Sequence, residues 1–190
     1  MVPDPGLVRR RLLAAGARPG FAGMMLDRRY DRGGELVARD EELRLRLYRY
    51  PDGREDAVIA WKGATRITPQ GYKERRELEY PIGGEHARPE ELLAALGYGE
   101  IHTIERYVEH YHQGDAVVRL EWYPRMDVLV EVEGSEAGIE AALRVIGLPR
   151  EAYTADALKE FADRFATRTG RPAVLVAAAL DGEAPSWESR

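Results

Sequence analysis

The sequence predicts an α+β protein built mainly from antiparallel strands. Several segments alternate apolar and charged residues, which is the period of a strand with one buried face. The tripeptide Pro51-Asp52-Gly53 lies between two such segments and is typical of a hairpin turn. Fewer segments have the helical period, and each of them starts at a capping residue or a proline. Many strands with a few helices favour the α+β class.

The elements follow from local signals. Asp4, Ser135 and Thr154 are capping residues and Pro89 suits a first helical turn, so we expect helices over 4–16, 89–97, 135–146 and 154–165. Strands are expected over 21–30, 43–50, 55–62, 73–82, 100–112, 116–123 and 127–133. We expect a single domain over residues 1–170 and a C-terminal appendage and tail over residues 171–190.

The composition limits the function classes. The chain has 190 residues, 44% hydrophobic and 32% charged, which is typical of a globular protein with a core. Its formal net charge of −5 argues against a nucleic-acid-binding protein. The lack of cysteine excludes disulfides, thiol catalysis and cysteine-bound zinc. Without an apolar run of membrane-spanning length or a signal-peptide pattern, we expect a cytoplasmic protein that does not bind a membrane.

The faces of the expected strands carry the functional signal. In residues 43–47 the leucines share one face, while Arg44 and Arg46 share the other. The expected strands 73–82 and 127–133 also alternate, and their charged faces include Lys73, Arg75, Glu77, Glu79, Glu131 and Glu133. A sheet with one face in water explains this pattern. A closed antiparallel β-barrel with a charged interior and helices packed outside explains it as well.

The kinds of charged residue favour the barrel, with a charged ligand inside it. Arginine and lysine donate hydrogen bonds to phosphate oxygens, and the basic residues of this set are Arg44, Arg46, Lys62, Lys73, Arg75 and Arg106. Two pairs of glutamates are spaced by two residues: Glu77 with Glu79, and Glu131 with Glu133. The two members of each pair therefore lie on one strand face, about 7 Å apart. Such hard oxygen ligands suit Mg²⁺ or Mn²⁺ shared with a phosphate, although each pair by itself is also typical of a solvated strand edge.

Seven short pieces of the sequence occur in a recognisable order. They are Asp27-Arg28-Arg29-Tyr30-Asp31, Leu43-Arg44-Leu45-Arg46, Trp61-Lys62-Gly63, Arg75-Arg76-Glu77-Leu78-Glu79, Arg106, Leu120-Glu121 and Glu131-Val132-Glu133-Gly134. In this order they resemble the CYTH superfamily, the triphosphate tunnel metalloenzymes, which include class IV adenylyl cyclases, thiamine triphosphatases and inorganic triphosphatases. The resemblance covers most of residues 2–155. It implies an eight-stranded antiparallel β-tunnel with helices outside.

The resemblance also implies roles for these residues. Those that would bind a triphosphate or a nucleoside triphosphate are Arg44, Arg46, Lys62, Lys73, Arg75 and Arg106, of which Lys62 and Arg106 would act in catalysis. Those that would bind Mg²⁺ or Mn²⁺ are Glu77, Glu79, Glu131 and Glu133. The implied reaction is metal-dependent hydrolysis of an inorganic or organic triphosphate. Two alternatives stay open: a class IV adenylyl cyclase that makes cyclic AMP from ATP, and a non-catalytic polyphosphate- or nucleotide-binding protein.

The sequence departs from the family pattern at its start. The family has a Glu-x-Glu-x-Lys strand before its first helix, whereas this chain starts with Met1-Val2-Pro3-Asp4-Pro5. We therefore expect Met1 to be an internal start and the tunnel to lack its first strand. An open sheet edge would then be free to pair with a second copy of the chain as a homodimer. The missing carboxylates would leave the 190-residue chain weakly active or inactive.

Overall fold

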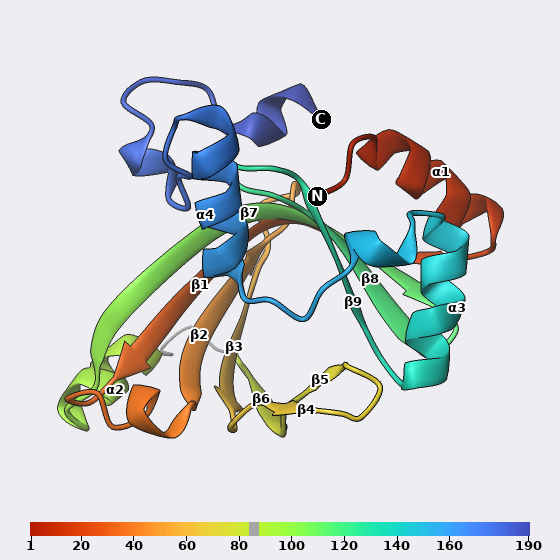
Figure 1. Cartoon of the computed structure of the whole chain (residues 1–190). Helices are drawn as coiled ribbons and strands as arrows, with labels where there is room; N and C mark the ends of the chain where they lie inside the picture. Colours follow the sequence, from red (N-terminus) through yellow and green to blue (C-terminus); the bar gives the residue numbers. More distant parts are fainter. Residues whose placement is uncertain (84–87) are drawn as a thin grey trace. The chain divides into compact units, whose positions relative to one another are not determined.

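The computed structural model describes residues 1–83 and 88–190, and its helices and strands confirm the α+β class. The chain forms two compact units, and Figure 1 labels their helices and strands. The central unit comprises residues 24–105, and the terminal unit comprises residues 1–23 and 106–190. The strand order of the main sheet is β6-β3-β2-β1-β7-β8-β9, and β4 and β5 form a separate two-stranded sheet.

The central unit is built on four strands whose neighbours all pair antiparallel. Its elements are β1 (Arg18–Asp31, from residue 24 on), the 3₁₀ helix η1 (Val37–Arg39), β2 (Glu42–Arg49), β3 (Glu55–Lys62), β4 (Arg66–Ile67), β5 (Lys73–Glu74), β6 (Glu77–Ile82), α2 (Pro89–Ala95) and the start of β7 (Gly99–Gln113). The predicted hairpin joins β2 to β3. At this turn Gly53 has a φ of +86°, a conformation that glycine adopts without strain, and its N–H donates to the Tyr50 carbonyl.

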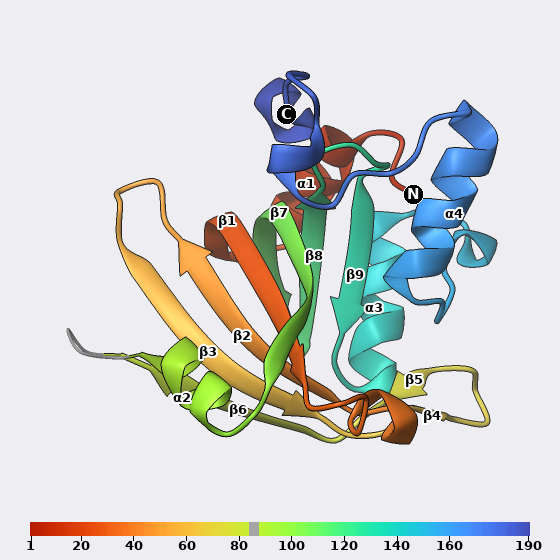
Figure 2. The ribbon, with the colours of Figure 1, turned by 90° about the vertical axis from the view of Figure 1, so that its left-hand side faces the viewer.

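One face of this sheet is apolar and partly covered by α2 (Figure 2). Tyr30 of β1, Leu45 of β2 and Leu93 of α2 are buried together there, and Leu43, Ile59, Ile82 and Tyr98 pack around them. Since successive side chains of a strand point to opposite faces, the alternate residues of these strands lie on the other face. That second face carries the charged residues, as the alternation predicted.

The expected strand over residues 73–82 is interrupted, so that prediction was wrong in its extent. Lys73 and Glu74 form β5 and pair with β4, whereas β6 starts at Glu77 and pairs with β3. Between them the Arg76 carbonyl accepts a hydrogen bond from the Gly63 N–H at 2.8 Å. At this interruption the Arg75 side chain donates to the Gly63 and Asp40 carbonyls and to the Glu42 carboxylate at the start of β2.

The terminal unit contains the start of β1, up to residue 23, and the end of β7, from residue 106 on. Its further elements are α1 (Pro5–Ala14), β8 (Ala116–Trp122), β9 (Leu129–Glu133), α3 (Glu136–Ile146), the 3₁₀ helix η2 (Arg150–Ala152), α4 (Leu158–Thr169) and the 3₁₀ helices η3 (Ala177–Ala179) and η4 (Ser186–Ser189). The Asp4 side chain caps α1 by accepting from the Leu7 N–H at 2.7 Å, as predicted. The Ser135 hydroxyl oxygen likewise caps α3 by accepting from the Gly138 N–H.

Helices α1 and α3 pack against one face of β8 and β9 in the core of this unit (Figure 1). The fully buried side chains of this core include Leu12 of α1, Val118 and Leu120 of β8, and Ile146 of α3. Trp122 of β8 stacks edge-on against the Tyr107 ring, with the ring centroids 5.9 Å apart. The strand residues of opposite parity, such as Arg119 and Glu121, therefore lie on the other face.

The last helix starts later than its predicted cap. α4 begins at Leu158, and the Thr154 hydroxyl oxygen accepts a hydrogen bond from the Asp156 N–H instead of capping the helix. After α4 the chain returns to the end of β8. There the Ser186 N–H donates to the Pro124 carbonyl at 3.0 Å and the Ser186 hydroxyl donates to the Tyr123 carbonyl at 2.6 Å. Trp187 packs against the core of the terminal unit.

Among the helices of the described residues, every one is too short or too polar to cross a bilayer.

Candidate functional site

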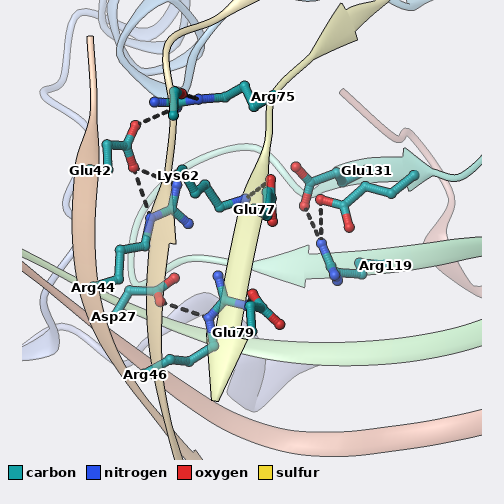
Figure 3. A network of polar contacts seen from close by, with 12 residues as sticks. Asp27, Glu42, Arg44, Arg46, Lys62, Arg75, Glu77, Glu79, Arg119 and Glu131 are labelled. Carbon is teal, nitrogen blue, oxygen red and sulfur yellow. Dashed lines mark hydrogen bonds and ion pairs between the residues drawn. The ribbon is translucent and has the colours of Figure 1, made fainter. Parts of the chain in front are cut away.

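The charged face of the central unit brings together residues from four strands. In the sheet register Arg46 lies opposite Asp27 on β1, and Lys62 on β3 lies between Glu42 on β2 and Glu77 on β6. We call the set the central cluster (Figure 3). It comprises Asp27, Glu42, Arg44, Arg46, Lys62, Arg75, Glu77 and Glu79. Predicted phosphate ligands and predicted metal ligands are therefore neighbours on one sheet face.

A buried ion pair lies at the centre of this cluster. The Arg46 Nε atom donates to Asp27 Oδ1 at 2.8 Å, and the two side chains are 6% and 2% exposed. Arg46 Nη1 also donates to the Tyr48 hydroxyl at 3.2 Å. Burial would lower the pKa of Arg46, but the Asp27 carboxylate outweighs it and raises that pKa well above its usual value. Arg46 is thus a fixed cation whose position Asp27 determines.

Each of the two predicted metal ligands of β6 forms an ion pair with a basic side chain. Lys62 Nζ donates to Glu77 Oε1 at 2.5 Å. Arg46 Nη1 lies 3.8 Å from Glu79 Oε1. Glu77 and Glu79 are two residues apart on the same strand face, as the sequence predicted, and both are exposed.

Glu42 holds two of the predicted phosphate ligands, and sequence reasoning missed it. Its carboxylate accepts from Arg44 Nη2 at 2.6 Å and from Arg75 Nη1 at 2.8 Å, and Arg29 Nε lies 3.6 Å away. Burial would raise the pKa of Glu42, but Arg44, Arg29 and Arg75 together lower it from 4.5 to about 2. The parity signal was available, because Glu42 lies two residues before Arg44 and therefore on the same face.

We expect this depressed pKa to appear in the acid stability of the protein. A carboxylate with a lower pKa in the folded state stabilises it above the unfolded value, and the contribution is lost as the pH falls through the folded value. The window is therefore between pH 4.5 and about 2. The shift corresponds to about 3 kcal/mol of unfolding free energy.

Urea denaturation at several pH values checks this expectation. The unfolding free energy of the wild type should fall more steeply between pH 4.5 and about 2 than that of Glu42→Gln, which cannot titrate at this position. Equal slopes for the two proteins would contradict the assignment.

Arg75 and Lys73 differ from the other predicted phosphate ligands. Each of the three guanidinium nitrogens of Arg75 donates to an acceptor: Nε to the Gly63 carbonyl, Nη1 to Glu42 and Nη2 to the Asp40 carbonyl. Arg75 thus ties together three segments of the central unit. Lys73 is exposed on the separate β4–β5 sheet, and the interruption after Glu74 removes it from the charged strand face on which it was predicted.

The terminal unit has a second charged set, which we call the terminal cluster: Arg106, Arg119, Glu121, Tyr123, Glu131 and Glu133. Arg106 Nε lies 3.2 Å from Glu121 Oε1. The Tyr123 hydroxyl donates to Glu121 Oε2 at 2.5 Å. Burial raises the pKa of Glu121 despite the attraction of Arg106, and burial likewise raises the pKa of Tyr123.

The other predicted metal ligands belong to this cluster. Arg119 Nη1 lies 3.1 Å from Glu131 Oε2 and 2.7 Å from Glu133 Oε1, and Figure 3 draws the Arg119–Glu131 contact. Both glutamates are partly exposed on β9. Sequence reasoning included Glu121 in a matched piece but gave it no role, and it did not single out Tyr123.

The donor chemistry decides how a divalent metal could fit. In residues 1–83 and 88–190, no three carboxylates or histidines come together as a ready metal site. Each of the four predicted ligands is paired with Lys62, Arg46 or Arg119. Magnesium usually takes one or two carboxylates and completes its shell with water and substrate phosphates. The glutamate pairs fit a metal of that kind, but do not form a cage by themselves.

Comparisons with known proteins find likenesses in structure. No family model and no curated protein matches the sequence. The PH1819 protein from Pyrococcus horikoshii aligns with a TM-score of 0.63 and 19% identity, over 88% of this chain and 96% of that chain. A candidate adenylate cyclase from Vibrio parahaemolyticus aligns with a TM-score of 0.67 and 16% identity, over 84% of this chain and 92% of its own.

A third similar structure is that of a candidate adenylyl cyclase from Hippeastrum, which is described as revealing a dominant triphosphatase activity. It aligns with a TM-score of 0.55 and 16% identity, over 90% of this chain and 93% of its own. At these identities the likeness is one of fold. The shared architecture extends over nearly the whole of each of these proteins.

Proposed function

We propose that this chain, which has the fold of the CYTH superfamily, binds an inorganic or organic triphosphate and hydrolyses its phosphoanhydride bond. The observation that carries the proposal is the central cluster. Arg44, Arg46 and Lys62 lie on one face of adjacent strands, and Arg46 and Lys62 are buried. Burying cations on one sheet face is costly, so such a set is typical of a site that binds a multiply charged anion.

The proposed chemistry needs little beyond these groups. Phosphoryl transfer depends mainly on positioning the phosphates and on neutralising charge as the leaving oxygen departs. Arg46 is suited to positioning, because Asp27 fixes it on its strand face. Lys62 is suited to neutralising charge, because its ammonium group carries three donors and its present partner is an exposed carboxylate. Arg44, Arg75 and Arg106 remain predicted phosphate ligands, whereas Lys73 lies off this face on the β4–β5 sheet.

We also propose Mg²⁺ or Mn²⁺ as the cofactor. The residues that would hold it are Glu77 and Glu79 on β6, or Glu131 and Glu133 on β9, together with phosphate oxygens and water. When bound, such an ion neutralises charge on the phosphate oxygens. The activity described for the Hippeastrum protein supports hydrolysis as the first candidate, and the candidate adenylate cyclases among the similar structures support a cyclase as the second.

One assay separates the candidates. Purified protein is incubated with inorganic triphosphate or ATP and with Mg²⁺ or Mn²⁺, and free phosphate and cyclic AMP are measured. Release of phosphate supports the triphosphatase, and cyclic AMP supports the cyclase. Binding without turnover supports the non-catalytic alternative. A protein that neither binds nor turns over any triphosphate contradicts the proposal.

We expect Lys62→Met to weaken triphosphate binding about 10- to 100-fold, since it removes a charged donor but keeps most of the side-chain volume. The matched control is Arg49→Met. Arg49 lies on β2 on the opposite face from Arg46, is exposed and pairs with Glu55. Both variants lose one positive charge, so calorimetric binding curves measure the effect of position. Equal losses in the two variants would contradict the assignment of Lys62.

A further inference from the structure

The carboxylates around the buried cations of the central cluster fall into two kinds. Asp27 is buried and accepts a hydrogen bond from Arg46 at 2.8 Å. If Asp27 moved away, the buried charge of Arg46 would lose this counter-ion. Glu77 is different. Its side chain is 37% exposed, whereas the side chain of its partner Lys62 is 11% exposed. The cation of this second pair is fixed in the sheet, and its carboxylate has access to water.

We propose that Glu77 and Glu79 are exchangeable counter-ions that compete with phosphate for Lys62 and Arg46. This inference rests on the proposed function. In the free protein Glu77 neutralises Lys62, and Glu79 adds a second, longer contact of 3.8 Å to Arg46. A bound triphosphate takes over both cations, and the two glutamates turn towards solvent.

The register explains why the exchange affects these two carboxylates and leaves Asp27 in place. Glu77 lies directly opposite Lys62 on the neighbouring strand, and Glu79 lies opposite Ala60, whose methyl group makes no polar contact. Both glutamates belong to β6, which is the edge strand of the main sheet in residues 1–83 and 88–190 and pairs with β3. Asp27 lies on β1, is 2% exposed and pairs with Arg46 over a shorter distance. Moving a partly solvated carboxylate costs far less than moving a buried one.

The exchange has a consequence for the metal. While Glu77 is paired with Lys62, it is a poor ligand for a second cation, because the lysine already neutralises its charge. Once phosphate holds Lys62, the carboxylates of Glu77 and Glu79 remain two residues apart on one strand face, and Lys62 no longer offsets their negative charge. The chain is therefore expected to bind a divalent ion better with phosphate present than without it. The same residues that oppose the bare anion then favour the anion with its metal.

The test is calorimetric titration of inorganic triphosphate into the protein in a chelator, so that no divalent ion takes part. Glu77→Gln removes the competitor of phosphate but keeps the side-chain size. We expect it to bind metal-free triphosphate about fivefold more tightly than the wild type. The matched control is Glu55→Gln, which also removes one negative charge. Glu55 forms an exposed pair with Arg49 on the opposite face of the β2–β3 hairpin. This control should stay within about twofold of the wild type.

A second measurement uses Mn²⁺ alone, followed by the electron paramagnetic resonance signal of the free ion. Lys62→Met releases Glu77 without any phosphate. The Lys62→Met protein should therefore bind Mn²⁺ more tightly than the wild type, by a factor of about three or more. Arg49→Met should not change Mn²⁺ binding, because the carboxylate that it releases is Glu55.

The outcomes separate this inference from the proposed function. If wild type binds triphosphate but Glu77→Gln binds the metal-free anion equally or less tightly, Glu77 is not a competitor and the inference is wrong, while the proposed function stands. If no variant binds triphosphate with or without Mg²⁺, both are wrong. Thermal denaturation shows whether each variant is folded. If Glu77→Gln is not folded, the Mn²⁺ comparison of Lys62→Met with Arg49→Met tests the inference instead.

Discussion

Asp27→Ala should lower the free energy of unfolding by about 3–5 kcal/mol, because it leaves the Arg46 guanidinium buried without the Asp27 carboxylate. The two side chains are 2% and 6% exposed, so both charged groups are largely shielded from water in the folded protein. The contact to Glu79 at 3.8 Å is too long to compensate. Urea denaturation followed by circular dichroism measures the loss.

The matched control for this variant is Glu55→Ala. Glu55 pairs with Arg49 over the same distance of 2.8 Å, but both side chains are more than half exposed. We expect a loss below about 1 kcal/mol, since exposed ion pairs contribute little. A loss of similar size in both variants would contradict the view that burial makes the Asp27–Arg46 pair important.

A double variant separates stability from binding. Replacing both partners, as in Asp27→Leu with Arg46→Met, removes the buried charges together and should restore most of the unfolding free energy. Triphosphate binding should not recover, because the fixed cation is gone. Recovery of binding together with stability would show that Arg46 is a structural residue with no part in the site.

The second large effect concerns the buried set in the terminal unit. We expect Glu121→Ala to cost about 3–5 kcal/mol, because it leaves Arg106 buried without its carboxylate. Tyr123→Phe should cost less, about 1.5–3 kcal/mol, since it removes one hydrogen bond to a charged group. Urea denaturation of the two variants gives both values.

Glu131→Gln and Glu133→Gln are the controls for these variants. Both glutamates pair with Arg119, but they are partly exposed, so each change should cost less than about 1 kcal/mol. If either of them destabilises the protein as much as Glu121→Ala, the β9 carboxylates are structural rather than available to a metal.

The alternation of side chains accounts for what the sequence could predict. Parity places Arg44, Arg46 and Lys62 on one face and the leucines of β2 on the other, and the register confirms this arrangement. The same parity argument held for Glu77 with Glu79 and for Glu131 with Glu133. Capping residues predicted the starts of α1 and α3, because a capping side chain binds a backbone N–H only three residues away.

What could not be predicted depends on contacts between distant residues. The break before β6 coincides with the hydrogen bonds of Arg75, whose acceptors lie at positions 40, 42 and 63. A pattern along one strand does not show that a side chain will bind acceptors so far away in the sequence. In the same way, pairing of Glu77 with Lys62 depends on the β3–β6 register, so the sequence predicted a metal ligand and a phosphate ligand without showing that they neutralise each other.

The positions of the tryptophans give the chain a natural optical label for each unit. Of its three tryptophans, Trp61 lies on β3 beside Lys62, whereas Trp122 and Trp187 pack in the core of the terminal unit. A Trp61→Phe protein therefore emits from the terminal unit, and the difference from the wild type isolates the emission of the central unit. Since Trp122 is buried in this core and Trp187 packs against it, fluorescence of the terminal pair follows the core of the terminal unit without an added dye.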